Sequence, residues 1–333
     1  VVGIIDSGIN TDHPSFSAIA GDGYLHINPL GSGVYLGDCA GNFSRLCNNK
    51  LIGVYSYTVI TNEYADTDVF PADLARNGED YGGHGTHVAS TVAGNILLNI
   101  PESLPEFGAQ QSDGVPTGFV YPRISGVAPR ANIISYQVCW GGRADADDTY
   151  GDCSGAAINA AIEDAIEDQV DIINYSISGG GQPWNSSTEL AFLSARNAGI
   201  FVATSAGNNG PEAGSTLKHA PWYTAVAASE HGRVINYAKQ LTDFSGGNTD
   251  LSPLDGTSNT AGITASIVYA GDFINSNDPN NDPAQCLQPF PAGTFSGQIV
   301  VCDRGEIARV QKAVNVRDGG AGGYVLGNVF TGS

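Results

Sequence analysis

Three polar residues stand beside apolar segments in positions that suit acid–base chemistry. Asp6 follows the apolar run at residues 1–5, His84 opens the small-residue segment 84–90, and Asn208 follows the run at residues 200–205. An imidazole beside a carboxylate can act as a general base, and a side-chain amide can donate a hydrogen bond to a developing oxyanion. We expect Asp6 and His84 to form a hydrogen bond, because small residues let a helix begin at His84 close to the end of the first strand.

Each of these residues also has an ordinary structural interpretation. An Asp after a strand is most often a turn former, and Asn208 before Asn209 and Gly210 would be a plain turn residue. His84 and His87 lie three residues apart and could pair as metal ligands, although no carboxylate completes an HExxH arrangement. These alternatives stay open on the residues alone.

Short apolar runs alternate with helical patterns in the first part of the chain. The runs lie at residues 1–5, 133–138, 170–176 and 200–205. Residues 154–168 repeat Ala and Ile at spacings of three and four beside an acidic face, and residues 190–197 continue the alternation. This order predicts an α/β fold with a parallel sheet and helices on both faces. Ligands of such sheets collect beyond the carboxyl ends of the strands.

The sequence changes character after about residue 230. Short runs separated by Gly, Asn, Asp and Pro follow, including the stretch 275–283. Residues 298–302 predict a strand, residues 306–317 a helix, and residues 324–326 a strand after a Gly-rich turn. We therefore expect two domains, at residues 1–240 and 241–333.

The composition excludes several classes of function. Of the 333 residues 14% are charged, and 34 acidic side chains against 14 basic ones give a formal net charge of −20. That sign repels phosphate backbones and anionic lipids, so neither a nucleic acid nor a membrane is an expected partner. No apolar stretch approaches the ~18 to 20 residues of a spanning helix. The absence of Met, even at the first position, predicts that the chain is an incomplete portion of a longer protein.

The six Cys residues fall into three neighbouring pairs. The pairs are Cys39 with Cys47, Cys139 with Cys153, and Cys286 with Cys302. Six Cys allow about 15 connectivities, of which local pairing is the simplest, and an even count favours an oxidising compartment. This predicts a secreted or extracellular protein, with the periplasm as the alternative, and no CxxC supports a zinc site.

Three segments occur together in a familiar order. Asp6-Ser7-Gly8, then residues 84–87 (HGTH), then residues 205–208 (SAGN) resemble the motifs of the subtilisin-like serine proteases, or subtilases. The catalytic residues of that family run Asp, His, Ser along the chain. Residues 174–179 (NYSISG) resemble the family's substrate-binding strand, with Ser178 where Gly is usual.

Longer stretches resemble the cucumisin-like subgroup of the subtilases. They match in order and approximate spacing, at residues 47–53 (CNNKLIG), 138–140 (VCW), 205–211 (SAGNNGP), 220–222 (APW) and 297–305 (GQIVVCDRG). The last stretch is similar to the protease-associated, or PA, domain that this subgroup carries before its catalytic serine. The resemblance implies an incomplete subtilisin-like catalytic domain followed by a partial, β-rich PA domain.

The resemblance also implies roles for individual residues. His84 would be the general base, Asp6 would accept its other ring proton, and Asn208 would donate to the oxyanion. The residues implied to bind substrate are Ser176, Ile177, Ser178, Gly179, Ala206 and Gly207. The implied activity is a secreted serine endopeptidase without cofactor or metal, whose partners are protein or peptide substrates and its own propeptide. Loops at residues 145–152 and 275–282 are rich enough in Asp and Asn to bind calcium, but neither has the EF-hand pattern and no calcium site is predicted.

The family's nucleophile is absent from this sequence. In subtilases it lies in a Gly-Thr-Ser-Met motif that opens a buried helix, and this chain contains no Met. Residues 256–258 (GTS) repeat the first three positions, but they precede the PA segment and no small apolar helix follows. Ser258 is therefore not the expected nucleophile, and we expect the serine to lie after residue 333. The alternatives are a peptide-binding pseudoprotease that uses the groove and the PA module, and a metal-dependent hydrolase built on His84 and His87.

Overall fold

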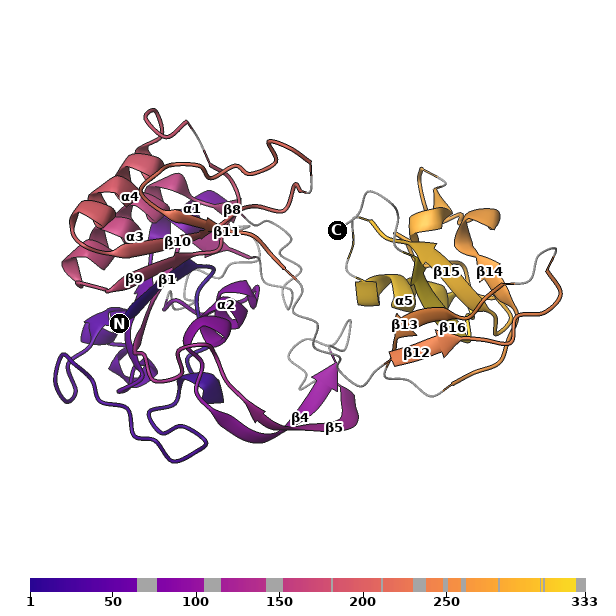
Figure 1. Cartoon of the computed structure of the whole chain (residues 1–333), viewed down its shortest axis with the longest axis horizontal. Coiled ribbons are helices and arrows are strands. Elements are labelled where there is room, and N and C mark those ends of the chain that lie inside the picture. The colour runs from indigo at the N-terminus through magenta and orange to yellow at the C-terminus, as the bar shows by residue number, and fades with distance from the viewer. Residues whose placement is uncertain are drawn as a thin grey trace. The chain divides into compact units, whose positions relative to one another are not determined.

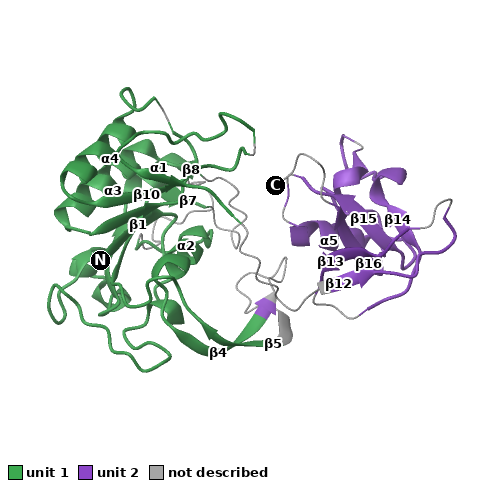
Figure 2. Ribbon diagram, in the orientation of Figure 1, with its two compact units in different colours: residues 1–102, 118–229 green, residues 103–117, 230–333 purple. Residues whose placement is uncertain are grey.

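The computed structural model forms two compact units (Figure 2). It describes residues 1–64, 77–104, 115–141, 152–180, 182–210, 212–229, 238–247, 251–258, 262–280, 282–305, 307 and 309–327. Unit 1 comprises residues 1–102 and 118–229, and unit 2 comprises residues 103–117 and 230–333. The expected boundary between residues 240 and 241 stays a prediction. No helix among the described residues has the length and apolar character needed to cross a bilayer.

Unit 1 is built on a seven-stranded sheet in which all pairs are parallel (Figure 1). The strands are β1 (Val2–Asp6), β2 (Leu36–Gly37), β3 (Leu51–Ser56), β6 (Ile133–Gln137), β9 (Ile172–Tyr175), β10 (Phe201–Ser205) and β11 (Thr224–Val226). Their order across the sheet is β11-β10-β9-β1-β6-β3-β2. The predicted parallel α/β sheet is confirmed.

Helices cover both faces of this sheet, as the sequence predicts. Helices α1 (Thr58–Tyr64), α3 (Gly155–Glu167) and α4 (Ser187–Asn197) pack on one face, and α2 (His84–Ala93) packs on the other (Figure 1). Along β1, Ile5 joins the core under α3, whereas Val2 and Ile4 join the core under α2. All of β1 is buried for this reason, and such two-sided burial explains its uninterrupted apolar sequence.

The α2 face is only partly covered. Register pairs Val2 with Ile172 and Ile172 with Phe201, so these three side chains share that face. Val2 is buried, but Ile172 is 38% exposed and Phe201 47% exposed, and Val226 farther along is 55% exposed. Among the described residues no helix covers the α2 face of β9, β10 and β11.

Two two-stranded sheets and several 3-10 helices lie outside the main sheet. One two-stranded sheet pairs β4 (Leu97–Leu104) with β5 (Val115–Ile124), and the other pairs β7 (Cys139–Trp140) with β8 (Asp152–Cys153) in antiparallel register. The 3-10 helices are Pro14–Phe16, Asp38–Ala40, Ser44–Leu46, Ala270–Asp272 and Pro283–Gln285.

Unit 2 has its own small core. Strands β14 (Ile267–Tyr269), β15 (Ile299–Asp303) and β16 (Gly323–Gly327) form a parallel sheet, and β12 (Ala238–Leu241) pairs with β13 (Leu254–Thr257). Helix α5 (Arg309–Asp318) contributes Val316 to the core, where it joins Phe290, Phe295 and Val300. The strands predicted at residues 298–302 and 324–326 are confirmed, and the predicted helix begins later, at Arg309.

All three local disulfides expected from the sequence are present. They join Cys39 to Cys47, Cys139 to Cys153, and Cys286 to Cys302. The first and third lie in the hydrophobic cores of units 1 and 2. Each therefore constrains a short loop and fixes it to a core.

Candidate active site

The register of the central strands brings three predicted segments to one edge of the sheet. Ile5 pairs with Tyr175, and Tyr175 pairs with Thr204. The residues that follow these three, Asp6, Ser176 and Ser205, therefore stand side by side at the carboxyl end. Strand β9 lies between β1 and β10, so the ends of β1 and β10 are about 10 Å apart.

Asp6 and His84 form the hydrogen bond that the sequence predicts. Asp6 Oδ1 lies 2.7 Å from His84 Nδ1. The Asp6 side chain is 1% exposed, whereas that of His84 is 60% exposed. Because the bond uses Nδ1, the other ring nitrogen, Nε2, is left for a reacting group. This is the geometry of an oriented base at an accessible sheet edge.

Burial governs the electrostatics of Asp6. It raises the pKa of the Asp6 carboxyl, and the hydrogen bonds from His84 and from the Ser7 backbone N–H oppose that rise. The second oxygen, Oδ2, is buried and has no hydrogen-bond partner among the described residues. Asp6 is therefore a buried carboxyl whose side-chain hydrogen bond within the described residues goes to His84.

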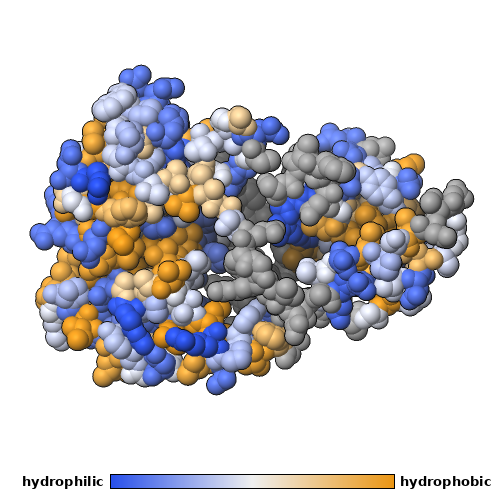
Figure 3. Space-filling model, in the orientation of Figure 1, coloured by the Kyte–Doolittle hydropathy of each residue, from blue (hydrophilic) through white to orange (hydrophobic). Residues whose placement is uncertain are grey.

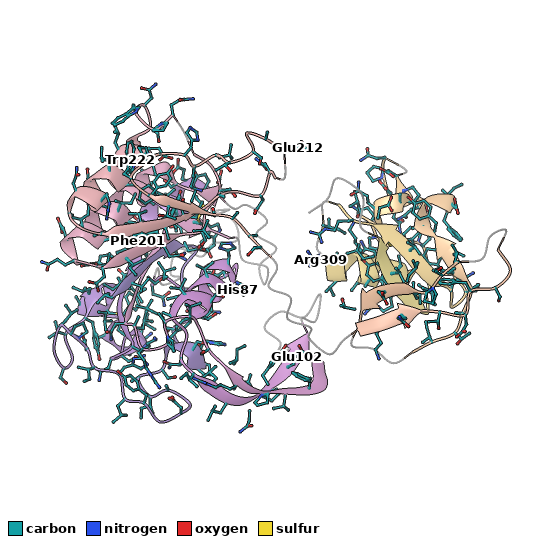
Figure 4. All side chains as sticks on the ribbon, in the orientation of Figure 1. His87, Glu102, Phe201, Glu212, Trp222 and Arg309 are labelled. Atoms are coloured by element: carbon teal, nitrogen blue, oxygen red, sulfur yellow. A yellow bond between two sulfur atoms is a disulfide. The ribbon has the colours of Figure 1, made fainter. Side chains whose placement is uncertain are left out.

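A glycine lets α2 begin against the end of β1. A Cβ on Gly85 would lie 2.3 Å from Gly8 O, which is closer than a side chain permits, and 3.1 Å from Ser7 N. The His-Gly sequence thus places the histidine beside Asp6. His87 lies farther along the same helix and is exposed (Figure 4). Within the described residues no group of three or more His, Cys, Asp or Glu side chains is arranged to hold a metal.

Asp80 is a site residue that the sequence analysis missed. It is 4% exposed, and its Oδ1 accepts hydrogen bonds from Ser7 Oγ at 2.9 Å and from Gly83 N at 2.9 Å. Its Oδ2 accepts from Thr86 N at 2.8 Å and from Thr86 Oγ1 at 2.7 Å. Asp80 therefore ties the residue after Asp6 to the residues that flank His84. The available signal was a carboxylate just before a helix, where free backbone N–H groups need acceptors.

The predicted substrate-binding residues lie on the turns after β9 and β10. Ser176 and Ile177 are half-buried, Ser178 and Gly179 are exposed, and Ala206 and Gly207 are half-buried. Asn174 Nδ2 donates to Ser176 Oγ at 3.0 Å, and Ala206 N donates to Val226 O at 2.9 Å. Because β9 and β10 are neighbours in the sheet, the two segments lie next to each other.

Asn208 follows the second of these segments on an exposed turn. Its side chain forms no hydrogen bond with another described residue, which leaves the amide available for a ligand. Its role as a donor to an oxyanion remains a prediction.

Other sequence candidates fall elsewhere. Ser258 follows β13 in unit 2, whereas Asp6 and His84 belong to unit 1. In the loop at residues 275–282, Asp278 accepts from the backbone N–H groups of Asn280 and Asp282, so its oxygens serve the turn itself. The loop at residues 145–152 lies outside the described residues except for Asp152.

Comparisons with known proteins identify the family of the chain. The subtilase family model matches residues 1–290, and the PA domain model matches residues 259–332. Subtilisin-like protease SBT1.4 of Arabidopsis thaliana is 32% identical over 342 residues, which cover 98% of this chain and 38% of that protein. Subtilisin-like protease SBT1.7 of the same plant is 31% identical over 340 residues, which cover 98% of this chain and 39% of that protein. A solved structure titled S41 psychrophilic protease is 22% identical with a TM-score of 0.32, over 63% of this chain and 46% of that one. The chain thus spans less than two fifths of the length of these plant relatives.

Proposed function

We propose, since the chain belongs to the subtilase family, that it supplies the base, the oxyanion donor and the peptide-binding segments of a secreted serine endopeptidase. The observation that carries this proposal is the 2.7 Å hydrogen bond between buried Asp6 and exposed His84. It lies at the sheet edge where the turns after β9 and β10 also end. Apart from the nucleophile, acyl transfer requires a general base, a segment that binds the peptide and an amide donor at one edge.

In the proposed reaction His84 Nε2 takes the proton of a serine hydroxyl as the oxygen attacks the peptide carbonyl. Asp6 accepts the Nδ1 proton, which fixes the tautomer and stabilises the imidazolium. The Asn208 amide donates to the carbonyl oxygen as it becomes an oxyanion. The imidazolium then protonates the departing amine, which leaves the acyl group on the serine. In the second half of the reaction His84 takes a proton from water as the water attacks the acyl group, and it returns that proton to the serine oxygen.

The substrate lies extended against residues 176–179. Backbone hydrogen bonds to this segment hold the peptide as an added strand, so affinity depends mainly on main-chain groups. Protein or peptide substrates are therefore the proposed partners, together with the propeptide that the family resemblance implies.

The open part of the α2 face supports a nucleophile that lies outside residues 1–333. A parallel sheet is normally buried on both faces, yet Ile172, Phe201 and Val226 are exposed. Figure 3 shows apolar side chains gathered on this part of unit 1, around the Phe201 labelled in Figure 4. We propose that the remainder of the parent protein covers this face and carries the serine.

Three disulfides support a secreted location. Disulfides persist in oxidising compartments and are rare in the cytosol, where thiols are kept reduced. The pairs at Cys39, Cys139 and Cys286 are all formed within the chain.

Peptide hydrolysis by the parent protein tests the proposed function. His84→Gln should lower kcat by about 10⁶-fold, the loss measured when the triad histidine of subtilisin, a member of this family, is replaced. His87→Gln is the matched control, because it makes the same change on an exposed histidine of the same helix. Equal losses in the two variants would favour a metal-dependent site, and an active His84→Gln variant would refute the proposal. A parent that binds peptides but never cleaves them would establish the pseudoprotease instead.

A further inference from the structure

Lys218 is a buried cation between the two segments that we propose to bind substrate. It is 3% exposed. Its Nζ donates to Ile177 O and lies 3.4 Å from Ser205 Oγ, and Ser205 Oγ itself donates to Ile177 O at 3.2 Å. The ammonium also lies 5.1 Å from the centre of the Tyr175 ring. The positive charge therefore sits where the ends of β9 and β10 meet.

The described part of the chain offers this cation no ion pair. Burial lowers the pKa of Lys218, and the negative charge of Glu189 opposes that shift. Glu189 is itself 3% exposed, yet no salt bridge joins the two among the described residues, and Lys218 Nζ is directed at a carbonyl oxygen instead. A buried ammonium without a carboxylate is costly, so such a charge is usually paired or held for a ligand.

The segments at residues 176–179 and 205–207 have open space next to Gly179 and Gly207 and are closely packed next to Gly180. A Cβ on Gly179 or on Gly207 would meet no atom within 4 Å. A Cβ on Gly180 would instead lie 2.4 Å from Leu217 O and 3.4 Å from Lys218 Cγ. The loop that carries Lys218 therefore packs under the first segment, while the side next to Gly179 and Gly207 can receive a peptide.

We propose that Lys218 determines substrate specificity, and that a Glu or Asp side chain of the peptide enters between residues 176–179 and 205–207 to meet its ammonium. The inference rests on the proposed function, since it takes these segments to be the peptide groove. The donor already points at the junction, and a carboxylate would replace a neutral carbonyl acceptor with an oppositely charged one. A Lys or Arg side chain at the same position would be repelled.

The test compares peptides that differ at one residue, Glu, Gln or Lys, as substrates of the parent protein. An ion pair between the Glu carboxylate and the Lys218 ammonium, which Gln cannot form, predicts that kcat/KM is about 10- to 100-fold higher for Glu than for Gln. Lys218→Gln should bring this ratio close to one, and Lys218→Arg should keep most of it. Lys239→Gln, the same change at an exposed lysine of β12, should leave the ratio unaltered. If a folded Lys218→Gln variant keeps the same preference for Glu over Gln, Lys218 has only a structural role and the inference fails.

Equilibrium binding separates this inference from the proposed function. Calorimetry with peptides that end in Glu or in Gln measures the preference without any cleavage. If the parent cleaves nothing but binds the Glu peptide at least tenfold more tightly, the endopeptidase assignment fails and the acidic subsite stands. If Lys218→Gln does not fold, the measurements on the wild-type protein still test the inference. The inference is overturned if the wild type shows no preference for Glu over Gln in either kcat/KM or binding.

Discussion

At the scale of single residues, the site depends on a contrast in exposure within one hydrogen bond. Asp6 is buried and His84 is exposed, although their side chains are 2.7 Å apart. The buried partner has a fixed position and a strong field, while the exposed partner can reach a substrate. The buried charge of Asp6 costs folding free energy, but it lies where it would orient His84 as the proposed base.

The charge of Asp6 is predicted to serve activity at the expense of stability. Burial raises its pKa, so the carboxyl ionises less easily in the folded protein than in the unfolded chain. Ionisation of Asp6 therefore destabilises the folded state above the raised pKa, and the destabilisation is relieved as pH falls through that pKa. Asp6→Asn removes the carboxylate that accepts the His84 Nδ1 proton. This change should lower kcat of the parent by about 10⁴-fold, the loss typical of a wrong histidine tautomer.

Chemical denaturation at pH 7 supplies the second measurement for this variant. The free energy of unfolding of Asp6→Asn should equal or exceed that of the wild type, because no charge is buried. Asp12→Asn, which changes an exposed carboxylate in the same unit, should alter neither quantity. Loss of stability with retained kcat would contradict the role of Asp6.

Asp80 is predicted to position His84 rather than to touch substrate. Asp80→Ala removes four hydrogen bonds that join Ser7, Gly83 and Thr86. We expect kcat to fall by about 10- to 100-fold with little change in KM, since a displaced base slows chemistry more than binding. Asp80→Asn retains an acceptor and should recover part of the rate. A rise in KM alone would assign Asp80 to substrate binding.

At the scale of elements, a glycine and a disulfide hold neighbouring helices, strands and loops close together. Gly85 allows α2 to meet the end of β1, and the Cys286–Cys302 bond joins the core of unit 2 to β15. That bond closes a loop of 16 residues in sequence. In the chain-entropy account such a loop contributes about 3 kcal/mol to stability.

Replacing Cys286 and Cys302 together by Ala should destabilise unit 2 selectively. All three Trp residues belong to unit 1, so the midpoint of denaturation followed by Trp fluorescence should not move. Hydrogen exchange over residues 262–327 should become faster by an amount that corresponds to about 3 kcal/mol. Replacing Cys39 and Cys47 is the matched control and should shift the Trp signal instead. A shift of the Trp signal in the first variant would contradict independent stabilisation of the units.

The sequence predicts the elements and residues whose signals are local. Asp6 and His84 were identifiable because a polar residue ends an apolar run and a Gly-rich segment opens a helix. Strands β2 and β11 were not predicted, because two or three residues carry too little periodicity. Asp80 and Lys218 were missed for a different reason. Their partners Ser7 and Ile177 lie 73 and 41 residues away, so only tertiary structure shows that these charges reach the site.

At the scale of the whole molecule, the proposed catalytic arrangement is only partly contained in this chain. Unit 1 carries the proposed base and the proposed peptide-binding turns, and part of its α2 face is open at Ile172 and Phe201. The plant relatives extend well beyond the matched region, since the chain covers 38–39% of their length. The proposed mechanism therefore requires a serine that the parent protein supplies.

Labelling of the parent protein with a fluorophosphonate tests this requirement most directly. The reagent reacts with a serine only where a base activates it, and peptide mapping by mass spectrometry identifies the modified residue. We expect one labelled serine, outside residues 1–333, and loss of labelling in His84→Gln but not in His87→Gln. Labelling of Ser258, or labelling that persists in His84→Gln, would contradict the account.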